Sequence, residues 1–159
     1  MQKQRVPSDI TIDVTKNFHA VEHRIEKVDT IDGVVYYNDS KGTNTDASIK
    51  AIKAMSRPTL LIAGGYDKNS PYDDFIESFD GKIKELVLIG ATAEKIKACA
   101  LEHGFTNIKM ADSLEEAVSI CKADSENGDA VLLSPACASW DMFKSYEQRG
   151  RLFKDLVKG

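Results

Sequence analysis

The chain has 159 residues, of which 42% are hydrophobic and 29% charged, and its formal net charge is −4. Such a balance is typical of one soluble domain, and the acidic excess argues against non-specific nucleic-acid binding, which needs clustered Lys and Arg. No apolar run approaches the roughly 18 residues that span a bilayer, and no apolar segment near Met1 indicates a secretory signal. We therefore expect no nucleic-acid or membrane partner.

Residues 1–17 are weakly patterned and are interpreted as a tail or linker before a domain of residues 18–159. Strand-like residues 24–30 and 33–37 flank Asp32-Gly33, a strong hairpin signal that predicts an antiparallel pair. A helix is predicted over residues 45–55, because its apolar residues share one face.

From that helix onward, strand and helix patterns alternate. Short apolar runs at 59–65, 85–90, 106–111 and 129–135 predict strands, most of them buried on both faces. Helices are predicted at 72–79, 92–104 and 113–123, with one or two more in 140–159. Ser113 and Glu116 have the spacing of a capping box at the start of the third helix. The expected fold class is α/β, a doubly wound, mostly parallel, Rossmann-like sheet with an antiparallel N-terminal hairpin strand.

The carboxyl ends of three predicted strands are unusually polar: "NDSKGTN" (38–44), "GGYDKNS" (64–70) and "SPACAS" (134–139). Ligands bind at this edge in open α/β sheets, and Lys41 and Lys68 suit an anion. A helix N-terminus after Thr43 adds partial positive charge. Simpler interpretations remain open for each loop: an N-cap at Thr43 or Asn44, a tight turn at 64–65, and a strand end at residue 134.

The three cysteines, Cys99, Cys121 and Cys137, are an odd number at wide spacings that suit neither a disulfide framework nor a zinc site. Cys99 and Cys121 fall among apolar positions of predicted helices, so buried thiols are expected there, in a reducing, cytoplasmic protein. Cys137 is a candidate nucleophile, but no His is close to it in sequence to activate it. The chain also lacks the P-loop pattern G-x-x-x-x-G-K-[ST] and the dinucleotide pattern G-x-G-x-x-G. If ATP is a ligand, most of it must be held outside this chain.

Five segments together resemble a known family: "HRIE", "YYNDSKGTNTDAS", "LIAGGYDK", "LLSPACASWDMF" and "YEQRG". In order and spacing they are similar to the C-terminal domain of the Mur ligases, in the branch that adds D-glutamate. The similarity runs from about Phe18 to Val157. It implies one domain of a three-domain, ATP-dependent ligase of peptidoglycan synthesis. That enzyme forms an acyl phosphate, which the amine of D-glutamate then attacks.

The resemblance also implies roles for particular side chains. Those implied to bind D-glutamate are Thr43, Lys68, Ser139, Trp140 and Tyr146. Those implied to reach the nucleotide are Arg24, Asp39 and Lys41. The family often has Phe at the position of Tyr146 and Ala at that of Gly42. Both departures are mild.

The family's catalytic groups and Mg²⁺ ligands belong to a central P-loop domain, so the resemblance implies no catalytic residue and no metal ligand in this chain. ATP, Mg²⁺ and UDP-N-acetylmuramoyl-L-alanine would be bound mainly by the missing domains, and the isolated domain is expected to be inactive. Two alternatives stay open. One is a free-standing, non-catalytic module for an anion or nucleotide. The other is a domain of a related amide ligase such as a folylpolyglutamate synthetase.

Overall fold

The structure, a computed structural model, describes residues 21–159. The predicted tail of residues 1–17 lies outside the described residues, as do residues 18–20. The described strands are β1 (Glu26–Ile31), β2 (Val34–Asn38), β3 (Thr59–Ala63), β4 (Ile83–Leu88), β5 (Ile108–Met110) and β6 (Ala130–Leu133). The described helices are α1 (Thr45–Ala54), α2 (Asp73–Glu77), α3 (Ala93–Glu102), α4 (Leu114–Asp124) and α5 (Tyr146–Lys158).

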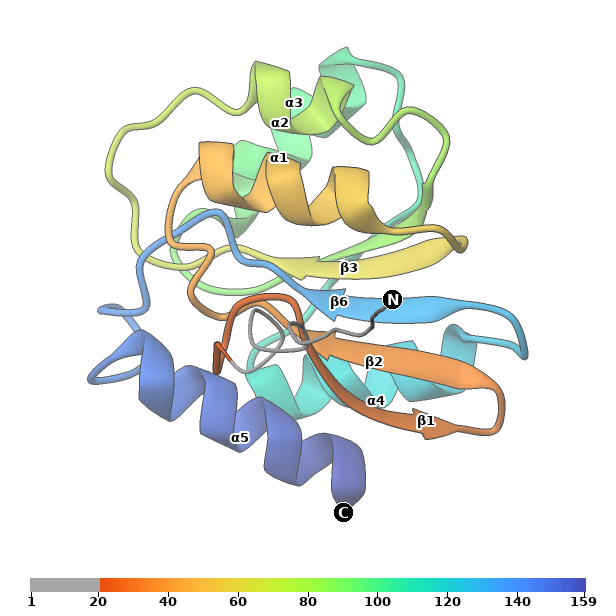
Figure 1. Cartoon of the computed structure of the whole chain (residues 1–159). Helices are drawn as coiled ribbons and strands as arrows, with labels where there is room; N and C mark the ends of the chain where they lie inside the picture. Colours follow the sequence, from red (N-terminus) through yellow and green to blue (C-terminus); the bar gives the residue numbers. More distant parts are fainter. Residues whose placement is uncertain (1–20) are drawn as a thin grey trace, which may run out of the picture.

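The strands form one six-stranded sheet in the order β1-β2-β6-β3-β4-β5. Only β1 runs antiparallel to its neighbour, and the other pairs are parallel. Helices α1, α2 and α3 cover one face of the sheet, and α4 and α5 cover the other (Figure 1). The predicted α/β class, doubly wound with an antiparallel hairpin strand, is confirmed. Within residues 21–159, no helix is long and apolar enough to cross a membrane.

The hairpin between β1 and β2 closes where the sequence predicts it. Ile31 pairs with Val34, so Asp32 and Gly33 form a two-residue turn. Both have positive φ angles, 53° and 78°, as a primed turn requires. The strand β1 begins later than predicted, because His23 and Ile25 also have positive φ angles that turn the chain before Glu26.

The central strands are buried on both faces, and alternate residues serve two separate cores. On β3, Leu61 packs toward α1–α3, whereas Leu60 and Ile62 pack toward α4 and α5. All three side chains are fully buried. The central strands therefore carry continuous apolar runs, because helices cover both faces of the parallel sheet.

Of the one or two helices predicted in residues 140–159, the structure has one, α5, and it begins at Tyr146. Ser145 is its N-cap, and the Ser145 Oγ accepts a hydrogen bond from the Gln148 amide at 3.1 Å. Before it, the amides of Met142 and Phe143 both bond to the carbonyl of Ser139, which makes a turn. The residues between β6 and α5 are thus a loop at the carboxyl edge of the sheet.

Candidate functional site

Three loops meet at the carboxyl edge of the parallel strands: a first loop (residues 39–44), a second loop (64–72) and a third loop (134–145). Backbone hydrogen bonds join the third loop to the first, where the Ala136 amide donates to the Gly42 carbonyl at 2.9 Å. The polar stretches that the sequence separates by up to about a hundred residues are therefore parts of one surface.

The second loop is bonded to the third in the same way. The Gly64 amide donates to the carbonyl of Pro135, and the Tyr66 amide donates to the carbonyl of Ala138, both at 2.9 Å. Gly65 has a φ of 156°, and a Cβ there would stand 2.6 Å from the Ala138 oxygen. The glycine pair is therefore explained by the close approach of two backbones, which excludes a side chain, and not by a tight turn alone.

Asp39 fixes the first loop to two other segments of the chain through hydrogen bonds to its carboxylate. Its Oδ1 accepts a hydrogen bond from the Ile25 amide at 3.0 Å, and its Oδ2 accepts one from the Ser134 hydroxyl at 2.6 Å. The Ser134 oxygen also lies 2.8 Å from the hydroxyl of Ser48 on α1. Asp39 is 2% exposed, and burial raises its pKa to about 6. Ser134 is thus more than a strand end, because it ties two loops and a helix together.

Arg149 on α5 holds the first and third loops from the other side. Its Nε donates to the Ser40 hydroxyl at 2.9 Å, and its two terminal nitrogens donate to the carbonyls of Ser40 and Cys137 at 2.7 and 3.2 Å. The side chain is 1% exposed, and burial lowers its pKa to about 10. Sequence reasoning assigned it no role. The only signal was its place in the segment "YEQRG".

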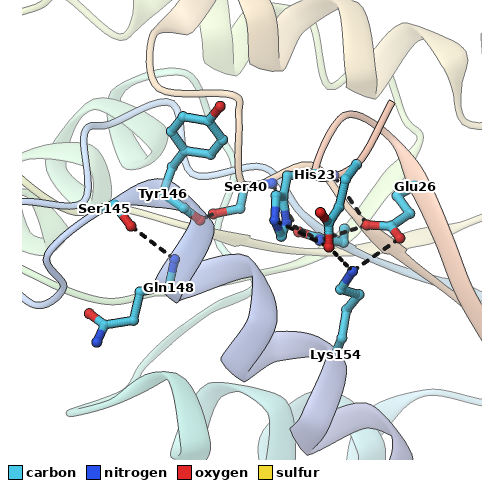
Figure 2. A network of polar contacts seen from close by, with 9 residues as sticks. His23, Glu26, Ser40, Ser145, Tyr146, Gln148 and Lys154 are labelled. Atoms are coloured by element: carbon cyan, nitrogen blue, oxygen red, sulfur yellow. Dashed lines mark hydrogen bonds and ion pairs between the residues drawn. The ribbon is translucent and has the colours of Figure 1, made fainter. Parts of the chain in front are cut away.

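The segment that enters β1 is fastened to α5 as well (Figure 2). Lys154 Nζ lies 2.6 Å from Glu22 Oε2 and 3.2 Å from Glu26 Oε2. The Ser40 hydroxyl donates to the Tyr146 carbonyl at 2.7 Å, at the first turn of the helix. These bonds fix where Tyr146 and Arg24 lie relative to the first loop.

A cavity of about 230 Å³ opens among these loops. Its lining residues are Thr43, Lys68, Ala138, Ser139, Trp140, Lys144, Ser145 and Tyr146. All five residues that the resemblance implied for one ligand are therefore in one place, although four loop or helix segments supply them. Lys144 and Ser145 were missed by sequence reasoning, because they lie between the quoted segments that carry the family resemblance.

The cavity is suited to an anion, because two of its lining residues are lysines and none is acidic. Among residues 21–159, no carboxylate forms an ion pair with Lys68 or Lys144. The Thr43 hydroxyl does not cap α1, since Asn44 is the N-cap and accepts from the Ala47 amide at 2.9 Å. Of the two candidate N-caps, Thr43 and Asn44, the structure therefore has Asn44.

Trp140, one of the lining residues, packs against an aromatic residue of the second loop. Trp140 is 65% exposed, and its ring centroid lies 5.3 Å from that of Tyr66. The carboxylate of Asp141, next to Trp140, accepts a hydrogen bond from the Ala91 amide at 2.9 Å. The third loop is therefore anchored on both sides of an exposed indole.

The three residues implied for a nucleotide are placed differently. Arg24 is exposed and Lys41 is half-buried, and the contact of either cation with a nucleotide stays a prediction. Neither lines the cavity. Asp39 is covered, and both of its oxygens already accept hydrogen bonds. Its contact with a nucleotide stays a prediction that requires the segment around Ile25 to move.

Cys137 lies behind the cavity and is 1% exposed. Its Sγ lies 3.3 Å from the hydroxyl of Tyr72 and 3.4 Å from that of Thr92. Burial raises the pKa of this thiol, which keeps it protonated. This environment argues against Cys137 as a nucleophile. Of the two cysteines predicted to be buried thiols, Cys121 is buried and Cys99 is only partly buried.

Comparison with models of known protein families shows which family this chain belongs to. Residues 23–137 match the model of the Mur ligase, glutamate ligase domain. The chain belongs to this family. The Mur ligase domain described here is 60% identical over 152 residues to UDP-N-acetylmuramoylalanine–D-glutamate ligase of Lachnospira eligens, and 50% identical over 153 residues to that of Clostridioides difficile. Each alignment covers 96% of this chain and 34% of the relative. The chain thus spans about a third of the length of the curated relatives it matches.

Solved structures show the same fold at low sequence identity. UDP-N-acetylmuramate-alanine ligase MurC of Thermotoga maritima has a TM-score of 0.61 at 13% identity, over 92% of this chain and 32% of that one. A folylpolyglutamate synthase of Mycobacterium tuberculosis, complexed with ADP, also has a TM-score of 0.61, at 11% identity. That alignment covers 84% of this Mur ligase domain and 32% of the synthase. These likenesses concern the fold alone.

Proposed function

We propose that this chain is the C-terminal domain of a UDP-N-acetylmuramoylalanine–D-glutamate ligase, and that it positions D-glutamate and closes over ATP. One observation carries the proposal. Residues from loops far apart in sequence, all implied by the family resemblance to bind D-glutamate, line a single cavity with two lysines and no acid. The names of the relatives at 50–60% identity supply the amino acid and the acceptor.

D-Glutamate carries two carboxylates and the amine that forms the new bond. Lys68 and Lys144 would each meet a carboxylate, and the hydroxyls of Thr43 and Ser139 would donate further hydrogen bonds. No acidic residue lines the cavity to pair with the amine, so that group stays available for attack. The cavity's role is orientation, whose value lies in holding the amine near the acceptor carbonyl.

The nucleotide would be shared between domains. ATP, when bound with Mg²⁺, supplies the phosphoryl group that activates the acceptor carboxylate. Arg24 and Lys41 would contact its oxygens from this side. The acceptor, UDP-N-acetylmuramoyl-L-alanine, and the P-loop would lie on the rest of the polypeptide. This chain alone is therefore expected to show neither ligation nor ATP hydrolysis.

Amide chemical shifts of the isotopically labelled chain, titrated with D-glutamate and in parallel with L-glutamate, test the proposal. Weak but saturable shifts are expected at Thr43, Lys68 and Ser139 for the D enantiomer, and smaller shifts for the L enantiomer. The affinity should be low because about two thirds of the relatives' length is absent.

Shifts confined to other parts of the chain would contradict the cavity assignment. A preference for another amino acid would favour a related amide ligase, as the shared fold with a folylpolyglutamate synthase allows. Tight binding of ATP by this chain alone would favour a free-standing nucleotide module.

A further inference from the structure

Four side chains of types that can bind metals lie together between helices α2 and α3, and none of them lines the cavity described above. Asp73 and Glu77 lie one turn apart on α2, and Cys99 and His103 lie one turn apart on α3 and its C-cap. Residues four apart share a helix face, so each helix presents a pair of donors to the other. The wide spacing of the cysteines predicted no zinc site, because only one of these donors is a cysteine and two of the others, Asp73 and Glu77, come from a different helix.

Three of these side chains converge on one point. His103 Nε2 lies 2.8 Å from Asp73 Oδ1, and the Cys99 thiol donates to the same oxygen at 3.6 Å. The thiolate, imidazole and carboxylate donor atoms all lie within 4.8 Å of one another. Ligands at about 2.0–2.3 Å from a tetrahedral Zn²⁺ are nearly this close together, so small side-chain rotations would suffice.

The other nitrogen of the imidazole has a partner suited to a metal site. His103 Nδ1 lies 3.8 Å from Glu77 Oε2. Metal-binding histidines commonly donate their second ring N–H to a carboxylate, which fixes the ring's orientation and raises its basicity as a ligand. Glu77 therefore stands where such a supporting carboxylate belongs, and the four residues have distinct roles.

We propose that Asp73, Cys99 and His103 form a site for Zn²⁺ or a similar transition-metal ion, with Glu77 orienting the imidazole and water completing the coordination. Thiolate, imidazole and carboxylate together favour zinc over the hard cations Mg²⁺ and Ca²⁺. On binding, the thiol proton and any second imidazole proton leave to solvent. Without metal, these protons hold the cluster by hydrogen bonds to Asp73.

The ion would join two helices that otherwise meet through side-chain packing. Helix α2 begins five residues after Lys68 in the sequence, at the end of the second loop. A metal that ties α2 to α3 would restrict this loop from its far end. The proposed metal site does not depend on the proposed ligase function, so an experiment can contradict one without contradicting the other.

Titration of the chain with Co²⁺ tests the site directly, since a cobalt–thiolate bond gives a charge-transfer band in the near ultraviolet. We expect this band to saturate at one Co²⁺ per chain and to disappear when Zn²⁺ is added in competition. Zn²⁺ should also raise the melting temperature. Absence of a thiolate band would overturn the proposal.

Variants separate the ligands from their surroundings. Cys99→Ser should abolish the band, and His103→Gln should weaken binding strongly. Glu77→Gln should weaken it by about 10-fold to 100-fold, the usual cost of losing a supporting partner. Glu94→Gln, an exposed acid at the start of the same helix, is the matched control and should bind as the parent does. A band that persists in Cys99→Ser would rule out this site.

Discussion

At the carboxyl edge of the sheet, Asp39 is buried with both oxygens hydrogen-bonded, whereas at the amino edge Glu85 is buried with Oε2 lacking any partner among residues 21–159. Asp39 is 2% exposed and Glu85 5%. Burial is the main cause that raises the pKa of Asp39 to about 6 and that of Glu85 to about 7. The two carboxyl groups are about equally buried, but only Asp39 has a hydrogen-bond partner for each of its oxygens.

The lysines show the reverse contrast. At the amino edge, Lys84 forms ion pairs with Asp129 at 2.7 Å and Glu126 at 3.2 Å. At the carboxyl edge, Lys68 and Lys144 line the cavity without a carboxylate partner among residues 21–159. The buried groups that hold the loops are thus hydrogen-bonded, whereas the cavity lysines at the same edge have no carboxylate partner among residues 21–159. At the opposite edge, Lys84 is paired with two carboxylates.

Replacing Arg149 should give the largest effect. Arg149→Met leaves the Ser40 and Cys137 carbonyls buried without donors, so we expect a loss of about 3 kcal/mol in the free energy of unfolding, measured in urea. Arg151→Met, an exposed neighbour on α5, is the control and should change stability by less than about 0.5 kcal/mol. Equal effects of the two would show that the buried guanidinium does not hold the loops.

Removing the brace beneath the first loop should cost less. Ser134→Ala deletes the hydroxyl that donates to Asp39, and we expect a loss of about 2 kcal/mol, because this bond reaches a buried carboxylate. The hydrogen bond lowers the pKa of Asp39, so that pKa should rise above about 6 in the variant. Carbon-13 titration of the carboxyl group checks this shift. An unchanged pKa would contradict the brace.

The cavity lysine should affect ligand binding but not folding. In the complete ligase, Lys68→Ala should raise the KM for D-glutamate by about 10-fold to 100-fold, the loss of one charge-assisted hydrogen bond. Lys84→Ala, at the opposite edge, should lower stability and leave this KM unchanged. If Lys68→Ala retained a normal KM and kcat, the assignment of the cavity to D-glutamate would be wrong.

The smallest effect is expected at Glu85, and its sign is opposite. Because the folded chain raises this pKa from 4.5 to about 7, the folded state binds more protons between these values, and stability falls as pH rises through them. Asp124, whose pKa is lowered mainly by Lys109, is already ionised in this range. Glu85→Gln should therefore stabilise the chain by about 1 kcal/mol at pH 8. Denaturation curves at pH 4.5 and pH 8 measure the difference, and a variant less stable at pH 8 would contradict it.

Local patterns were sufficient to predict most of the fold. The turn at Asp32-Gly33 and the cap at Ser113, whose Oγ accepts from the Glu116 amide at 3.0 Å, depend on residues close together in sequence. The meeting of three polar loops at one edge followed from the parallel sheet. The specific cavity residues were implied by family resemblance, because sequence spacing alone does not distinguish Lys68 from an ordinary surface lysine.

What the sequence did not reveal depends on distant contacts. Arg149 in a helix pattern resembles a surface residue, and its burial is decided by the Ser40 and Cys137 carbonyls that the folded chain brings to it. The start of α5 was placed too early because Trp140–Lys144 carries a helix-like pattern. Its conformation is instead set by the turn at Ser139 and by the bond from Ala91 to Asp141.

The position of β6 between β2 and β3 has a consequence for how the chain folds during synthesis. Until Ala130 has left the ribosome, β2 and β3 each expose an unpaired edge, and the third loop does not yet exist. Such edges pair readily with other chains. Long-range parallel pairing is also intrinsically slow. A nascent chain that stalls before this strand is therefore prone to aggregate, and its ligand cavity can assemble only after nearly all of the domain has been translated.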